Sequence, residues 1–445
     1  MQKTFEYDNQ TFHDLEILKE LHETSVFTIF NKTLTEGGSD FLKKLFQNPI
    51  TDLEELESRG RFIQFLVENP LKLAISSRQI KFIERYINLN TLILKSNPID
   101  SLYLRFTEWL RPSNEYYLLK AGCESLIQVL HELNQKLHQD STSSELELFT
   151  ITQRGLIQEL ESELLLNPTL SWHKVIKLDQ LFRGKYNRDL KALLQEIYIL
   201  DAYISIAKTA SEKGFTLPKY EKSPKPIFFA RELKHPLLET AITNDIDIGI
   251  EKNMCFLTGP NMAGKSTFLK SIGISIFLAH LGFPVPAREL RTSIYSGMIT
   301  TINLSDNLSF GYSHFYSEVK RVKESVNAIA NGKNVLVIFD ELFRGTNVKD
   351  AFEASTEIIK GFAEVDNCTF FVSTHIVEIA DEIKSNSSIS FKYFDSTLIG
   401  NELQYSYKLK TGVSSERLGM YIVKKEGIID LLKSIKKPVT GTKNP

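Results

Sequence analysis

Residues 259–267 read Gly-Pro-Asn-Met-Ala-Gly-Lys-Ser-Thr and match the pattern G-x-x-x-x-G-K-[ST]. The apolar run 255–257 before them predicts a buried strand, and the stretch 268–281 after them is compatible with a helix. This order restricts the fold, because a glycine-rich loop between strand and helix directs backbone N–H groups and a helix N-terminus at a bound phosphate. A plain glycine turn at a helix start is the alternative, and the combination of strand, loop, Lys-Ser and helix argues against it.

The same pattern assigns chemistry to particular side chains. Lys265 is expected to reach the β- and γ-phosphates of a nucleotide, and the Ser266 hydroxyl is expected to complete the shell of a Mg²⁺ ion. The candidate nucleotide-binding residues are Gly259, Pro260, Asn261, Met262, Ala263, Gly264, Lys265, Ser266 and Thr267.

A second motif follows at residues 334–341, which read Asn-Val-Leu-Val-Ile-Phe-Asp-Glu and predict a buried strand ending in two acids, as in a Walker B segment. Asp340 can bind Mg²⁺ through water, and Glu341 can polarise an attacking water. Adjacent acids after a strand are common in loops, but the phosphate-loop pattern about 75 residues earlier favours the functional interpretation. Ser266 and Asp340 are the candidate metal ligands, and Glu341 and Lys265 are candidate catalytic residues.

A third apolar run ends in Ser373-Thr374-His375. A histidine at this strand end could sense the γ-phosphate or hold the attacking water, although a single histidine is more often structural. Its position after a strand, as in the other two motifs, favours a catalytic role for His375. Glu341 and His375 together suit a slow, switch-like nucleotide hydrolase better than a small-molecule kinase, since no acceptor site is visible.

Composition limits the class of protein. A chain of 445 residues predicts two or three domains, and 42% hydrophobic against 24% charged residues is ordinary for a globular protein. No apolar run reaches the length of a membrane span and residues 1–6 lack a secretory pattern, so a cytoplasmic protein without membrane partners is expected. The three cysteines have no metal-ligand spacing. A formal charge of −2 does not indicate nucleic-acid binding, although local basic surfaces matter more.

The pattern changes along the chain. Residues 1 to about 225 predict helices, with stretches around 72–95, 114–138, 144–165 and 187–213, and a capping box from Thr51 to Glu54. Closely spaced prolines at 218–226 mark a linker. Strands and helices then alternate, which predicts a largely parallel sheet, and the runs 389–394 and 403–409 predict late strands that extend it as a meander.

Several motifs together resemble the ATPase domain of MutS mismatch-repair proteins. They are the run Thr-Gly-Pro-Asn-Met-Ala-Gly-Lys-Ser-Thr at 258–267, Asp-Glu-Leu-Phe-Arg-Gly-Thr at 340–346, Ser-Thr-His at 373–375 and Gly-Val-Ser-Ser at 412–415. Upstream, residues 31–38 with 48–53 resemble the start of the MutS core domain, and residues 231–239 resemble the family's entry into the ATPase domain.

The resemblance implies a fold and an assembly. It implies an α/β, ABC-type P-loop ATPase domain at 226–410, C-terminal to an all-α helical core and lever domain at 1–225 and followed by a helical dimer-contact segment at 411–445. It also implies Mg²⁺-dependent ATP hydrolysis in a homodimer with two composite sites. Ser313, in the segment that matches the signature loop, would then contact the partner's nucleotide in trans.

The chain also departs from the family pattern. The core-like segment begins almost at residue 8, so neither a mismatch-reading domain with its Phe-x-Glu wedge nor a connector domain is expected. The DNA-gripping clamp is expected to be missing or reduced, and whether a remnant lies in 80–190 stays open. Tyr312 and His314 stand where the family usually has Arg and Thr.

The expected function is that of an ATP-dependent DNA-binding switch. Hydrolysis would be coupled to dimer closure and lever motion in DNA mismatch repair or recombination, with repair or recombination proteins as further partners, although mismatch specificity itself is not supported. A nucleotide-gated assembly protein that acts on a protein partner without binding DNA is the alternative, and the near-neutral composition favours it slightly.

Overall fold

A computed structural model describes residues 4–19, 24–73, 75–91, 93, 114–139, 170–302, 314–399, 402–414 and 425–435. The chain divides into two compact units, of which the first comprises residues 1–29, 48–60 and 210–445 and the second comprises 30–47 and 61–209. Parts of the N-terminal region therefore belong to the same compact unit as the residues after 210.

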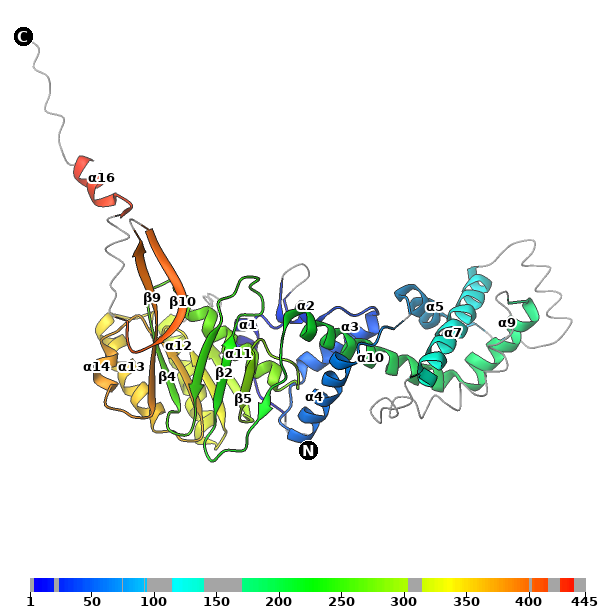
Figure 1. Ribbon diagram of the computed structural model, residues 1–445, viewed down its shortest axis with the longest axis horizontal. Helices are drawn as coiled ribbons and strands as arrows, with labels where there is room; N and C mark the ends of the chain where they lie inside the picture. The colour runs from blue at the N-terminus through cyan, green and yellow to red at the C-terminus, as the bar shows by residue number, and fades with distance from the viewer. Residues whose placement is uncertain are drawn as a thin grey trace, which may run out of the picture. The chain divides into compact units, whose positions relative to one another are not determined.

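The first unit contains a six-stranded sheet in the order β10 (Glu402–Thr411), β9 (Ile389–Ile399), β4 (Met254–Thr258), β8 (Thr369–Ser373), β7 (Val335–Phe339) and β6 (Gly297–Thr301). All neighbours are parallel except β10, which returns antiparallel to β9. The long strands β9 and β10 extend beyond β4 (Figure 1). The predicted α/β class, the largely parallel sheet and the late extending strands are confirmed.

Parallel register brings the carboxyl ends of the central strands together. Every residue of β4, β7 and β8 is buried, as expected for apolar runs covered on both faces. The described helices of this unit include α11 (Lys265–Ala279), α12 (His314–Ala330) and α13 (Val348–Ala363), with the shorter α1 (Asn9–Asp14), α14 (Ile379–Ile383) and α16 (Ile428–Ile435). One core cluster joins the sheet to α13, where Phe362 stacks on Phe370 at a centroid distance of 4.7 Å.

A smaller antiparallel-rich sheet has the order β1 (Lys219–Tyr220), β5 (Glu289–Thr292), β2 (Phe228–Leu233) and β3 (Asn244–Ile248). Arg291 lies over the ring of Phe229, with its guanidinium carbon 4.0 Å from the ring centroid, and Arg231 pairs with Asp245 at 2.9 Å. The segment between β2 and β3 leads from this sheet to the phosphate loop's side of the unit, where it lines a cavity described below.

The N-terminal segment covers the free edge of β6. Glu6 forms a parallel bridge with Gly297, and the buried carboxylate of Asp14 accepts hydrogen bonds from the hydroxyl of Thr300 and the amide of Ile302, each at 2.8 Å. Asp8 forms an ion pair with Arg321 of α12. These bonds across nearly 300 residues of sequence explain why residues 1–29 belong to the first unit.

The second unit is helical. It contains α3 (Glu36–Gln47), α5 (Ser77–Ile87), α7 (Asn114–Gln139), α9 (Trp172–Asp179) and the π-helix η1 (Gln180–Lys185). The short α2 (Val26–Phe30) and the longer α4 (Leu53–Glu68) and α10 (Asn187–Lys213) pass from one unit into the other. Predicted helices near 72–95, 114–138 and 187–213 are confirmed, and the stretch 144–165 lies outside the described residues.

One detail of the first unit corrects the sequence prediction, and one detail of the second unit extends it. The capping box from Thr51 to Glu54 is wrong, because α4 begins at Leu53 and the side chain of Asp52 accepts the Glu55 amide at 3.1 Å. A buried ion pair joins Asp179 to Arg183 at 2.5 Å, and the Tyr86 hydroxyl donates to the same carboxylate at 3.0 Å.

No helix in the described part of the chain is both long and apolar enough to cross a membrane.

Candidate nucleotide site

The predicted phosphate loop joins β4 to α11, as its sequence context required. Gly259 and Gly264 adopt φ values of 142° and 101°, which favour glycine. A Cβ at Gly259 would lie 2.6 Å from the carbonyl oxygen of Phe394, so glycine is also required there sterically. The loop therefore has the turn and the close approach to a neighbouring strand that its two glycines predict.

Lys265 begins α11 and points back over the loop. Its side chain is buried, and Nζ donates hydrogen bonds to the carbonyl oxygens of Gly259 at 2.8 Å and Pro260 at 3.2 Å. Burial lowers the pKa of this ammonium group, and the carboxylate of Glu341, 3.9 Å away, opposes that effect. The cation is thus held at the mouth of the loop, where a phosphate chain would replace the two carbonyl partners.

The two candidate metal ligands are in contact. The Ser266 hydroxyl donates to one oxygen of Asp340, and the Ser373 hydroxyl donates to the other. Asp340 directly follows β7 and Ser373 is the last residue of β8, so parallel register brings them to one edge. Burial raises the pKa of Asp340. A buried carboxylate beside a hydroxyl is a set of hard oxygen donors that fits Mg²⁺, which would also compensate the buried charge.

Glu341 follows with an uncommon backbone conformation. Its φ is 55°, in the left-handed region, and its amide donates to the hydroxyl of Ser373 at 3.0 Å. Its carboxylate lies 3.3 Å from Arg344 and faces Lys265. Such backbone strain is found at sites where the surrounding structure fixes a functional group. The hydroxyl of Ser373, at the end of β8, therefore holds both Walker B acids, because it donates to the Asp340 carboxylate and accepts from the Glu341 amide.

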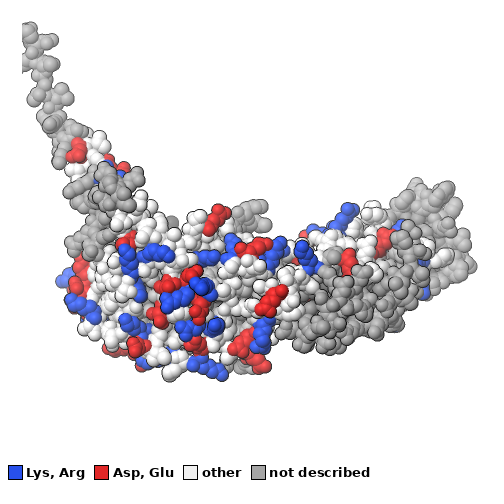
Figure 2. Space-filling model, viewed as in Figure 1, with Lys and Arg blue, Asp and Glu red and all other residues white. Residues whose placement is uncertain are grey.

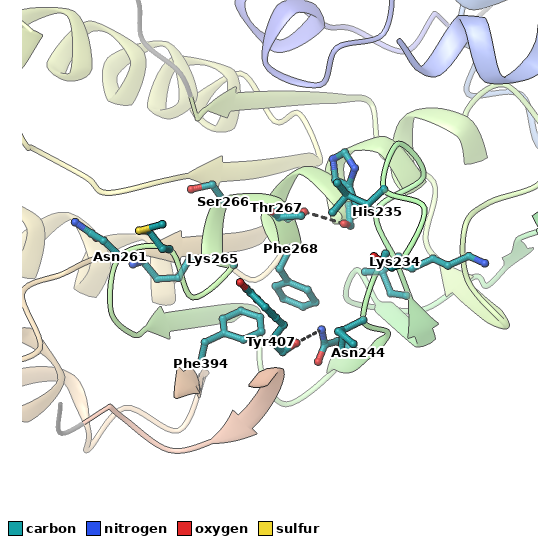
Figure 3. A pocket seen from close by; sticks show the side chains of 18 of the residues that line it. Lys234, His235, Asn244, Asn261, Lys265, Ser266, Thr267, Phe268, Phe394 and Tyr407 are labelled. Atoms are coloured by element: carbon teal, nitrogen blue, oxygen red, sulfur yellow. Dashed lines mark hydrogen bonds between the residues drawn. The ribbon is translucent and has the colours of Figure 1, made fainter. Parts of the chain in front are cut away.

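A cavity of about 590 Å³ opens beside the loop. Figure 3 shows the loop residues on one side and residues of the 233–244 segment on the other, with Tyr407 and Phe394 between them. Phe394 meets Phe268 edge to face at a centroid distance of 5.7 Å, and Tyr407 approaches Gly264 closely enough that a Cβ there would lie 3.2 Å from its ring. The cavity thus has a phosphate-loop end and an aromatic end.

Comparison with known proteins agrees with this geometry. The family model described as MutS domain V matches residues 255–437. DNA mismatch repair protein MutS from Petrotoga mobilis is 24% identical over 97% of this chain and 53% of its own length, and MutS from Borrelia garinii subsp. bavariensis is 23% identical over 95% and 59%. Residues 255–437 therefore match MutS domain V, and the chain is similar to MutS proteins over most of its length.

DNA mismatch repair protein MSH3 from Candida glabrata is a further relative, 28% identical over 55% of this chain and 25% of its own length. The chain spans about half the length of the two bacterial relatives and a quarter of the MSH3 protein. The resemblance predicted from the motifs is therefore confirmed at the level of the family.

The remaining predicted residues differ in their placement. Ser414, in the Gly-Val-Ser-Ser motif, is buried, and its amide donates to the Thr258 hydroxyl at 2.9 Å, so this motif is attached to the end of the phosphate-loop strand. His375 is exposed after β8 and does not line the cavity within the described part of the chain, so its contact with a γ-phosphate stays a prediction. Ser313 lies outside the described residues.

The aromatic end was not anticipated from the sequence. Tyr407 lies in a strand of regular alternation, 403–409, and alternation alone places it on the same face as Tyr405 and Leu409. A register shift between Tyr405 and Leu409 interrupts the pairing with β9, so alternation no longer determines the direction of the Tyr407 side chain. No local signal in the sequence marks this shift, because it depends on contacts with β9 and with Asn244, which lie elsewhere in the sequence.

Proposed function

We propose that this MutS-family chain binds ATP with Mg²⁺ in the cavity beside α11, hydrolyses it, and uses the cycle as a conformational switch. The observation that supports this most is the meeting of the Ser266 hydroxyl, the Asp340 carboxylate and the Ser373 hydroxyl at the mouth of a glycine loop. Lys265 and Glu341 lie beside them. In this proposal the phosphate site, the oxygen donors for Mg²⁺ and the candidate base act together beside one glycine loop.

Each group has a distinct role in the proposed reaction. Mg²⁺, when bound, supplies positive charge to the phosphate oxygens, and Ser266 and Asp340 hold it. Lys265 exchanges its hydrogen bonds to the loop carbonyls for bonds to β- and γ-phosphate oxygens. Glu341 accepts a hydrogen bond from the attacking water, and Ser373 keeps its backbone in position. The reaction yields ADP and phosphate.

The aromatic end of the cavity accommodates the base. Tyr407 is 44% exposed, so its ring is available on the cavity side, and Leu238 and Ile242 offer apolar surface from the 233–244 segment. Planar bases stack favourably on aromatic rings. The phosphate chain and the base therefore occupy opposite ends of one continuous cavity.

A homodimer is the proposed working form. The eight-residue helix α16 exposes four large aliphatic side chains, Ile428, Leu431, Leu432 and Ile435, each at least 46% exposed. Exposed apolar groups concentrated on one short helix favour contact with a partner, and a second copy fits the dimer implied by the family resemblance. In this proposal ATP closes the dimer, with Ser313 completing the partner's site, and the helical unit acts as a lever.

DNA is the proposed client, because the relatives are DNA mismatch repair proteins. The observation that favours the alternative, a protein client without DNA, is the charge pattern. On the face shown in Figure 2, Lys and Arg are interleaved with Asp and Glu. Ion pairs such as Arg288 with Glu232 and Arg291 with Glu221 likewise bring both signs of charge together. A DNA backbone prefers a continuous basic surface.

The deciding experiment measures DNA binding by the Glu341→Gln protein with ATP and Mg²⁺, a variant expected to retain ATP without hydrolysing it. The probes are matched duplex, mismatched duplex and four-way-junction DNA at two salt concentrations, with Lys265→Ala as the control expected to lose ATP binding. Salt-sensitive binding that requires ATP supports the DNA switch. Preference for the junction would indicate recognition of branched DNA, and preference for the mismatch would indicate mismatch recognition. Absence of binding at either salt would favour the protein client.

A further inference from the structure

The β10 bulge that carries Tyr407 is wide. Tyr405 pairs with Ser396 and Leu409 pairs with Phe394, so three residues of β10 stand opposite the single residue Asp395 of β9. Tyr407, at the centre of the three, has a φ of 52°, a value that costs a bulky side chain free energy. Some external contact has to hold this segment in place.

Asn244, the first residue of β3, supplies that contact. Its side chain is largely buried, and its Nδ2 donates to the carbonyl oxygen of Tyr407 at 3.0 Å, while its Oδ1 accepts the amide of Leu409 at 2.7 Å. One amide group therefore binds two backbone groups on either side of Lys408. Figure 3 shows the bond between Asn244 and the Tyr407 backbone at the aromatic end of the cavity.

A second link from the same place supports the bulge. The Lys408 ammonium group donates to the carbonyl oxygen of Thr243 at 2.7 Å, so two consecutive residues at the start of β3 bind the bulge. Between β10 and β9, the Ser406 hydroxyl donates to Asp395 at 2.6 Å. The backbone on both sides of Tyr407 is thus fixed, whereas the ring itself faces the cavity.

We propose that Asn244 is a positioning residue for nucleotide binding, which holds the β10 bulge so that the Tyr407 ring lies where the base stacks. Because this role presupposes the proposed nucleotide function, the test has to separate the base from the phosphates. ADP uses both ends of the cavity, and inorganic triphosphate uses the phosphate loop alone. Substitution of Asn244 is therefore expected to weaken ADP binding and to leave the binding of inorganic triphosphate unchanged.

The experiment compares dissociation constants for ADP and for inorganic triphosphate, measured by calorimetry on the full chain, in Asn244→Ala, Tyr407→Ala and the double variant. Tyr407→Ala weakens ADP binding about tenfold, as expected for a lost stacking contact, and Asn244→Ala weakens it by a comparable factor. Because both act through one ring, the double variant is no weaker than Tyr407→Ala. Triphosphate binding is unchanged throughout.

Two further variants serve as control and as reserve. Asn253→Ala removes an equally buried asparagine that bonds backbone carbonyls, including that of Val365 at 2.8 Å, at the opposite end of β4, and it leaves both ligands unaffected. Asn244→Asp, which keeps an acceptor for Leu409 but no donor for Tyr407, replaces Asn244→Ala if that variant does not fold.

Additive losses in the double variant, or a loss of triphosphate binding in Asn244→Ala, would overturn the positioning role while leaving the nucleotide function intact. Failure of the parent protein to bind either ligand would instead overturn the nucleotide function on which the role depends.

Discussion

His280, the residue that caps the C-terminal end of α11, makes the stability of the first unit depend on pH. Its imidazole is fully buried, with Nδ1 2.8 Å from the carbonyl oxygen of Ile276 and Nε2 3.1 Å from the amide of Tyr295. A carbonyl accepts and an amide donates, so only the neutral ring with its proton on Nδ1 satisfies both contacts. Burial lowers the pKa of His280 from 6.5 to about 4.

The sign and size follow from the difference between folded and unfolded chains. A folded pKa below the unfolded value means that the unfolded chain binds the extra proton, so stability is complete above pH 6.5 and falls as the pH decreases toward 4. The interval from 6.5 to about 4 corresponds to about 3.4 kcal/mol once the pH is below both values. At pH 5 the loss amounts to about 2 kcal/mol.

The assay is denaturant unfolding of the parent and of His280→Gln at pH 7.5, 6 and 5, followed by far-UV circular dichroism. Tryptophan fluorescence follows the unfolding of the second unit separately, because both tryptophans of the sequence, Trp109 and Trp172, fall within residues 61–209. At pH 7.5 the variant is less stable by about 1–2 kcal/mol, since it loses buried hydrogen bonds.

At pH 5 the parent has lost about 2 kcal/mol that the variant cannot lose, so the two curves approach or cross. The control His13→Gln replaces an exposed histidine and keeps a constant difference from the parent. A gap between His280→Gln and the parent that stays constant from pH 7.5 to 5 would refute the assignment of a neutral, buried ring.

Three further substitutions test other parts of the structure. Asp340→Asn removes a carboxylate whose pKa is raised by burial, so its charged form destabilises the fold above that pKa. The nucleotide-free variant should therefore melt at a higher temperature than the parent at pH 7.5. It should nevertheless lose Mg²⁺-dependent ATP hydrolysis. Phe343→Gly relieves a φ of 63° but removes a buried ring 5.3 Å from that of Phe315, so calorimetry should show a net loss of about 2–3 kcal/mol, and a more stable variant would contradict the packing role. Arg183→Met leaves Asp179 buried without its guanidinium partner and should cost the second unit about 3–5 kcal/mol, measured by tryptophan fluorescence, whereas no change would show that Asp179 is neutral or hydrated there.

The phosphate loop and the Walker B strand can be predicted because their signals are local. Each consists of an apolar run followed directly by the residues that act, and parallel register then brings Ser266 and Asp340 together without further information. The family resemblance rests on the same short motifs and is confirmed over residues 255–437.

The parts that escaped prediction depend on contacts between distant residues. The N-terminal segment shows short helical patterns, and nothing local indicates that Asp14 would bind the backbone of Ile302 and cover the edge of β6. Tyr407 likewise follows regular alternation until Asn244, more than 160 residues earlier, fixes the bulge. The residue that caps α4 is Asp52 and not the predicted Thr51, and the sequence does not separate the two because both residue types can cap a helix.

The central claim is that Glu341 activates water for ATP hydrolysis at a site that Lys265 and Asp340 complete. The most direct measurement is steady-state phosphate release by the parent and by Glu341→Gln with ATP and Mg²⁺, together with the affinity of each for ATP. If Glu341 activates the water, we expect Mg²⁺-dependent release by the parent, at least about a 100-fold lower rate in Glu341→Gln, and similar ATP affinities. Hydrolysis by Glu341→Gln at the parent's rate would contradict it.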